Sequence, residues 1–203
     1  MSDCTSTLLN DITFDCANAP IGGIEQNVLI VKKKDVLNVT YDGTRPLVVT
    51  SIQLTPGAAV CKLEGIKQAN GKAWELVKKE NAPDKYKHTF SGVIFNPSAL
   101  NKQNAAVLAD GAKYVIIIEQ MWKGAGSADA FEILGLHSGL EMSSMTNSSK
   151  ENDNMIVFEM ASVDGFEEPT PPKNFMKYTS NTPDYTATKT LFDAQLVAAT
   201  PST

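Results

Sequence analysis

Apolar and polar residues alternate along much of the chain, with the period of two that is typical of half-buried β-strands. In residues 24–31, Ile24, Gln26, Val28 and Ile30 fall on one face, and Val31 on the other face makes the alternation imperfect. Comparable patterns predict strands at residues 24–31, 36–41, 47–54, 60–66, 72–78, 88–95, 113–122, 130–136 and 155–163.

The run from Tyr114 to Ile118 is apolar at every position. A strand with two apolar faces is buried on both sides, so this run is predicted to lie at the centre of the fold. Asp42-Gly43 and Pro56-Gly57 supply turns between neighbouring strands. Asn70-Gly71 is the strongest short hairpin signal in the chain, and it predicts that residues 60–66 and 72–78 pair as a hairpin.

One helix is predicted, over residues 99–109, with Ser98 as its N-cap and Asp110-Gly111 as its stop. Its apolar face is expected to contain Leu100, Gln103, Val107 and Leu108. A single short helix cannot form a core alone, so it must cover a face or an edge of the sheet. The fold class that follows is mostly β, of the α+β type.

Two polar segments interrupt the strand pattern. Residues 143–154 are polar and charged, and suit either a docking surface or a simple loop. From Glu168 onward the chain is rich in proline and threonine, which favours extended backbone. We expect a β-rich domain over residues 1–167 and an extended C-terminal arm over 168–203. The arm packs either on its own domain or on a neighbouring subunit, and its removal is expected to weaken assembly more than folding.

Composition narrows the classes of function. The chain has 203 residues and a net charge of −5, and Arg45 is its only arginine. Binding to nucleic acid without sequence preference requires clustered lysine and arginine, and the lysine runs at 32–34 and 78–79 are short. A mildly acidic surface would instead repel a DNA backbone without gripping it.

The sequence carries no pattern of a catalytic or metal site. Cys61 with His88 or His137 is the only cysteine–histidine combination worth considering, and Cys61 lies in an ordinary strand pattern. The three cysteines leave at least one unpaired, which fits a reducing compartment. A signal peptide and an apolar run long enough for a membrane span are both missing. We therefore expect a cytoplasmically made structural protein, neither an enzyme nor a cofactor or metal binder.

Several short segments resemble the tail tube (major tail) proteins of bacteriophages, in particular phages of Bacteroides-type hosts. Residues 132–141, Glu-Ile-Leu-Gly-Leu-His-Ser-Gly-Leu-Glu, resemble a turn that follows a strongly apolar strand in that family. The opening, from Thr13-Phe14-Asp15-Cys16 through Gly22-Gly23-Ile24 to Val31-Lys32, is similar to the family's start. Phe158-Glu159-Met160-Ala161, followed by a proline-rich exit, is compatible with its end.

The resemblance implies a β-sandwich or partly closed barrel flanked by one short helix, with extended terminal arms. Six subunits would form a ring whose inner strands join around a lumen. Rings would stack into a virion tail tube through contacts made by a long loop and the terminal arms. Other phage tail proteins would be further partners. DNA would pass through the acidic lumen without specific binding. The implied inter-subunit residues are Ser143, Ser144, Asn147, Lys150, Glu151, Asp153, Pro169, Pro171, Pro172, Phe175, Tyr178 and Tyr185.

Two other functions remain open. The chain could be another tail or neck ring component, such as a terminator, connector or distal tail protein, which shares the fold without forming a tube. It could also be a β-sandwich module that binds a small ligand or carbohydrate, although Trp74, Trp122 and Tyr178 are widely spaced for that role.

Overall fold

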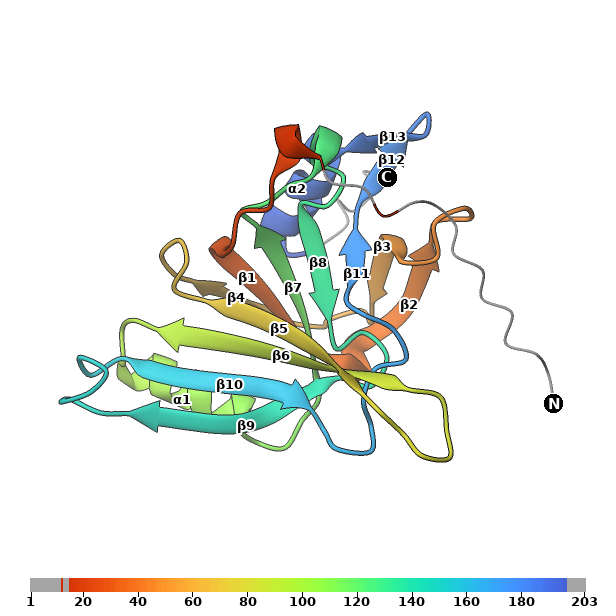
Figure 1. Cartoon of the computed structure of the whole chain (residues 1–203). Coiled ribbons are helices and arrows are strands. Elements are labelled where there is room, and N and C mark those ends of the chain that lie inside the picture. The colour runs from red at the N-terminus through yellow and green to blue at the C-terminus, as the bar shows by residue number, and fades with distance from the viewer. Residues whose placement is uncertain (1–11, 13–14, 197–203) are drawn as a thin grey trace.

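The computed structural model of the protein describes residue 12 and residues 15–196, and it is mostly β with two α-helices (Figure 1). This confirms the predicted α+β class. The helices are α1 (Ala99–Leu108) and α2 (Tyr185–Asp193). The strands are β1 (Ile24–Lys32), β2 (Val36–Tyr41), β3 (Val48–Leu54), β4 (Val60–Glu64), β5 (Gly71–Val77), β6 (Lys85–Ile94), β7 (Tyr114–Gln120), β8 (Phe131–Leu134), β9 (Leu140–Asn147), β10 (Ile156–Ser162), β11 (Lys173–Phe175), β12 (Lys177–Thr179) and β13 (Thr182–Asp184).

Eleven of these strands form one mixed sheet, in the order β2-β3-β11-β8-β7-β9-β10-β6-β5, with β1 between β7 and β4. The β-ladder between β9 and β7 consists of one residue pair only, Tyr114 with Leu140. The sheet therefore divides in two. We call β9, β10, β6 and β5 the lower sheet, and β4, β1, β7, β8, β11, β3 and β2 the upper sheet. The lower sheet runs across the bottom of Figure 1, and the upper sheet fans out above it.

Strand β7 is buried at all seven positions, which confirms the prediction of a central strand. Its residues alternate between two cores. Tyr114, Ile116 and Ile118 face the central core, which lies between the two sheets and α1. Val115 and Ile117 face the second core, which α2 covers. Complete burial of one such side chain contributes roughly 1.5–3 kcal/mol, so β7 anchors both layers.

Helix α1 has nearly the predicted bounds, and the Ser98 Oγ accepts a hydrogen bond of 3.2 Å from the Asn101 N–H as an N-cap should. The predicted apolar face was wrong in part. Ala105 and Leu108 are buried in the central core, whereas Leu100 is 66% exposed and Val107 is 46% exposed. The helix packs through one narrow stripe, because small Ala105 permits a close approach to the sheet.

The hairpin predicted at Asn70-Gly71 was wrong. Strand β4 pairs with β1 and β5 pairs with β6, so residues 65–70 cross from the upper to the lower sheet. The Gly65 N–H donates to the Gln26 carbonyl at 2.9 Å, which carries the chain onward along β1. The buried Asn70 side chain accepts from the Val93 N–H at 3.1 Å, so Asn70 is tied to β6 and does not form a turn tip.

The predicted bounds of the polar segment 143–154 and of the strand at 88–95 are also corrected. Residues 143–147 belong to β9, because Met142 and Met145 pack on the central core and continue the strand around a register shift opposite Glu159 and Met160. Only residues 148–155 form the connection between β9 and β10. Strand β6 begins at Lys85, before the start at residue 88 that the sequence predicts.

The predicted boundary at residue 168 and the extended arm are corrected for residues 168–196. Strand β11 lies inside the upper sheet between β3 and β8, and Phe175 and Phe192 are buried in the second core. Helix α2 was not predicted at all. Burial of these aromatic side chains outweighs the proline-rich preference for extended chain. The parts of the sequence analysis that fall on Cys4, Thr13, Phe14 and residues 197–203 lie outside the described residues.

Candidate assembly surface

The lower sheet turns one face to the central core and the other away from the molecule. In β6, Phe90 and Ile94 belong to the central core, so Thr89, Ser91 and Val93 point the other way. The registers of β5, β10 and β9 extend this outward layer across the sheet. We call it the outer face, and it comprises Ala73, Glu75, Thr89, Ser91, Val93, Glu141, Ser144, Thr146, Val157 and Glu159, with Lys85 and Lys87 at one end.

The outer face has mostly small, neutral side chains at its centre, with Glu159 as the charged exception. Ser91, Glu159 and Ser144 form one cross-strand row, and Val93, Val157 and Thr146 form the next. The residues named above include three carboxylates and two lysines, and none of them is aromatic. Such a surface is hydrated and slightly acidic, and it offers no row of cations to phosphate groups.

Both lateral strands of the lower sheet have a free edge. Strand β5 pairs with β6 on one side, and no described strand pairs with its other side. Strand β9 pairs with β10, and beyond Leu140 no described strand lies along its other side. Each free edge presents backbone N–H and C=O groups to a partner strand.

The free edge of β5 also carries exposed apolar groups. Trp74 is 48% exposed and Leu76 is 47% exposed. They share the core-facing side of the sheet with His88 and Tyr86, their register partners in β6. The Trp74 ring meets the Tyr86 ring edge-on, with 5.7 Å between centroids. The core side of the lower sheet is therefore left uncovered at β5.

The first group of predicted inter-subunit residues lies on β9 and at the tip of the β9–β10 hairpin, which projects from the molecule (Figure 1). All six are exposed. The Asn147 side-chain amide donates to the carbonyl groups of Asn154 at 2.7 Å and Met155 at 3.0 Å. The Ser148 Oγ accepts from the N–H groups of Lys150 and Glu151. The tip is therefore an internally bonded turn that presents Lys150, Glu151 and Asp153.

The second group is divided by the structure. Pro169 is exposed, and Pro171, Tyr178 and Tyr185 are half-buried. Pro172 and Phe175 are buried, so their assignment to a surface between subunits is corrected. Phe175 lies on the inward-facing side of β11, and its ring is buried in the second core.

A buried polar joint fixes the lower sheet against the upper one. The His88 Nδ1 accepts from the Gly135 N–H at 3.3 Å, and its Nε2 lies 3.0 Å from the Thr170 carbonyl. The Nε2 atom therefore carries the proton. Burial lowers the pKa of His88, although the nearby Glu168 carboxylate opposes the shift. Glu168 accepts from the N–H groups of His137 at 2.9 Å and Ser138 at 2.7 Å, which ties the β10–β11 connection to the turn before β9.

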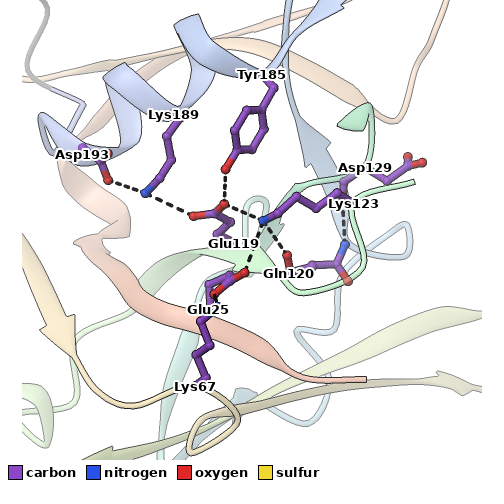
Figure 2. A network of polar contacts seen from close by, with 9 residues as sticks. All are labelled: Glu25, Lys67, Glu119, Gln120, Lys123, Asp129, Tyr185, Lys189 and Asp193. Atoms are coloured by element: carbon purple, nitrogen blue, oxygen red, sulfur yellow. Dashed lines mark hydrogen bonds and ion pairs between the residues drawn. The ribbon is translucent and has the colours of Figure 1, made fainter. Parts of the chain in front are cut away.

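A second polar cluster holds α2 at the end of β7 (Figure 2). The Glu119 carboxylate is almost fully buried, and it accepts from the Tyr185 hydroxyl at 2.6 Å and the Lys123 Nζ at 2.6 Å. The Lys189 Nζ lies 3.2 Å from its other oxygen. Burial acts to raise the pKa of Glu119, but the bonds from Lys123 and Tyr185 outweigh it and lower the pKa. Sequence reasoning missed this cluster, although a glutamate that ends an apolar strand was its visible signal.

The other residues considered for chemistry are separated. Cys61 lies exposed on β4, while both ring nitrogens of His88 are engaged by backbone groups. His137 is exposed in the turn before β9. Among the described residues, no group of histidine, cysteine and carboxylate side chains is arranged to hold a metal ion. No helix in the described part of the chain is long and apolar enough to cross a membrane.

Comparisons of this chain with protein-family models, curated proteins and solved structures found no match.

Proposed function

We propose that this chain is a structural subunit that assembles with copies of itself through the two free edges of its lower sheet. The observation that carries the proposal is the position of these edges. They lie on the outermost strands of the lower sheet, β9 and β5, and β9 is joined to β7 only at Leu140. Neighbouring strands in this sheet are all antiparallel, so β9 of a second copy laid against β5 continues the alternation.

A contact of this kind joins two different surfaces. Head-to-tail contacts between unlike surfaces generate rings when the rotation closes and filaments when it does not. The twist of a sheet gives each added copy a rotation relative to the last. A closed ring would merge the lower sheets into one barrel, in which every edge of β5 and β9 is paired.

The outer face supports a lumen on the inside of such a ring. Its uncharged Ser, Thr, Val and Ala side chains are short, and its charged groups, Glu159 at the centre among them, are of both signs with a small excess of carboxylates. DNA moving past this surface would meet hydration and weak repulsion instead of a row of lysines. The resemblance to phage tail tube proteins leads to the finer proposal: six copies form a ring, and rings stack into a tail tube through which DNA passes.

The experiment is a comparison of three proteins by size-exclusion chromatography with light scattering, followed by negative-stain microscopy. The wild type is expected to form rings or stacked tubes. Leu76→Lys places a charge beside the free edge of β5 and should abolish them, because an edge lysine blocks strand addition. Leu37→Lys is the matched control, since Leu37 is 65% exposed on β2, an edge strand of the upper sheet.

Loss of assembly in Leu76→Lys together with retention in Leu37→Lys supports the proposal. Equal behaviour of the two variants, or a wild type that stays a single chain at high concentration, contradicts it. Circular dichroism confirms that both variants fold. The microscopy also separates the two ring-based functions: stacked tubes support a tail tube subunit, and single rings support another tail or neck component.

A further inference from the structure

The last described part of the chain makes no backbone hydrogen bonds to the upper sheet after Met176. We call residues 177–196, which contain β12, β13 and α2, the strap. The final backbone hydrogen bond to the upper sheet is from the Met176 N–H to the Val49 carbonyl, at 2.9 Å. Beyond it, β12 pairs only with β13 in a separate sheet of two strands, and the remaining described backbone bonds of the strap are internal.

The polar attachment of the strap depends on one side chain. Within the described residues, Glu119 is the only charged side chain of the domain that forms a hydrogen bond or ion pair with the strap, through Tyr185 and Lys189 (Figure 2). Lys123 and Arg45 contact the strap only through the faces of aromatic rings. The one further polar contact is the Thr188 hydroxyl, 3.3 Å from the Met176 sulfur at the strap's own root. On the domain side, the Lys123 Nζ donates a hydrogen bond to the same carboxylate.

The apolar attachment is broader, because Phe192 and Leu196 are buried in the second core, whose other members come mainly from β1, β3, β7, β8 and β11. Phe192 and Tyr185 pack on Phe131, with ring centroids 5.2 Å and 5.7 Å apart. The Arg45 guanidinium lies over the Tyr178 ring at 4.5 Å. The surface beneath the strap thus combines part of the second core, including Phe131 on β8, with the buried Glu119 carboxylate. A second strap with the same sequence fits this surface as well as the first.

A buried cluster of charged side chains is not the most stable way to hold a helix permanently on a domain. Apolar residues of similar size would hold a helix at least as firmly, because each buried charge loses its hydration. Removing one partner from such a cluster leaves an unpaired charge, so the cluster makes docking conditional on the correct partner. A hairpin of two short strands is also only marginally stable by itself. Ser180, at its tip, has a φ angle of 50°, a backbone region that costs energy for serine, whereas Asn181, with a φ of 65°, tolerates this region.

We infer that the strap is an exchangeable element, docked on its own domain in the isolated chain and on the Glu119 site of a second copy in the assembly. The exchange needs a change of backbone direction only after Met176, and it replaces each contact of the strap with the identical contact in the partner. The inference rests on the proposed self-assembly for its role, but its structural content can be tested separately.

The test uses charge reversal in a background that carries Leu76→Lys, so that pairing of sheet edges is blocked. One chain carries Glu119→Lys, which repels its own Lys123 and Lys189. The other carries Lys189→Glu, which repels its own Glu119. In a reciprocal exchange between these two chains, each strap meets a site of opposite charge. The double variant Glu119→Lys/Lys189→Glu restores the attraction within one chain and serves as the control.

Light scattering should then give a two-chain mass for the equimolar mixture and a one-chain mass for each single variant and for the control. A one-chain mass for the mixture overturns the exchange. Because the edge is blocked, this result is independent of whether the wild type forms rings. If the wild type forms no rings but the mixture has a two-chain mass, the exchange is supported and the proposed function is refuted.

Hydrogen exchange provides a second measurement in case the reversed charges prevent folding. Glu119→Gln keeps hydrogen-bonding capacity but removes the charge. We expect amide exchange in residues 185–193 to become at least tenfold faster, which corresponds to a loss of about 1.4 kcal/mol in local stability. The exchange rates of β6 and β10 should stay unchanged. Equal exchange of α2 and β10 in both proteins would show that the strap opens only with the whole domain, and would overturn the inference.

Discussion

Tyr114 and Leu140 form the one residue pair through which β7 and β9 are joined, and hence the direct strand contact between the two sheets. Both side chains are buried in the central core. Gly135 lies against this pair, since a Cβ at that position would come within 2.9 Å of the Tyr114 carbonyl and 2.8 Å of the Leu140 side chain. The orientation of the lower sheet, and with it the direction of both free edges, is set at this point.

Gly135→Ala should therefore be strongly destabilising. Gly135 has a φ of 68°, and the added methyl group meets backbone as well as side chain. We expect a loss of roughly 3 kcal/mol in the free energy of unfolding, from strain and overpacking together. Gly111→Ala is the control, because its φ of 81° is similar but nothing lies within 4 Å of the new Cβ. Urea denaturation of the two variants should show a clearly larger loss for Gly135→Ala, and equal losses would contradict the role of this contact.

His88 should make stability depend on pH. Its pKa in the folded protein lies below the ordinary value of 6.5, so the folded state holds the proton less tightly than the unfolded chain. The stability contributed by neutral His88 is complete above that value and is lost as the pH falls below it. His88→Gln should flatten the stability profile measured by urea denaturation between about pH 7 and pH 5. His137→Gln, at an exposed position, should leave the profile unchanged, and the opposite ranking would refute the assignment.

Lys79 and Glu167 should contribute to acid stability. A hydrogen bond of 2.6 Å from Lys79 lowers the pKa of the buried Glu167 carboxyl to about 2. This depressed pKa stabilises the fold above the ordinary value of 4.5, and the stability is lost as the pH falls towards about 2. Lys79→Gln should raise the midpoint pH of acid unfolding. Lys78→Gln, at the exposed neighbouring position, is the control and should not move it.

Two truncations test the corrected C-terminal boundary. Removing residues 168–203 deletes β11 from the interior of the upper sheet, together with buried Phe175, so this chain should fail to fold. Removing residues 177–203 keeps the sheet intact and should leave a folded but less stable domain. Circular dichroism and thermal melting distinguish the two outcomes. A cooperative melt of the shorter chain would show that β11 is dispensable and would restore a boundary near residue 168.

Local patterns were sufficient to predict most strands. Strand β7 was recognisable because five consecutive apolar residues need burial on both faces, and Ser98 marked the start of α1 correctly. Helix α2 was missed because Tyr185–Asp193 contains three threonines, which favour strands or turns over helix interiors. Its N-cap was visible, since Asp184 accepts from the Ala187 N–H at 2.9 Å.

Pairing between strands could not be predicted in the same way. The Asn70-Gly71 signal favours a local hairpin, but the apolar residues of β4 and β5 belong to different layers, and tertiary burial decided the outcome. The free edges of β5 and β9 depend on which distant strands meet, so no local pattern could reveal them. The candidate residues at the β9–β10 tip are exposed, which their charge already indicates because charge density is itself a local property, and their role between subunits stays a prediction.

Electron cryomicroscopy of assembled wild-type particles tests the proposed assembly most directly. We expect each copy to place β9 antiparallel along β5 of its neighbour, with Ser91, Ser144 and Glu159 facing the interior of a closed ring. Particles in which both edges are open to solvent, or preparations that contain only single chains, would contradict it.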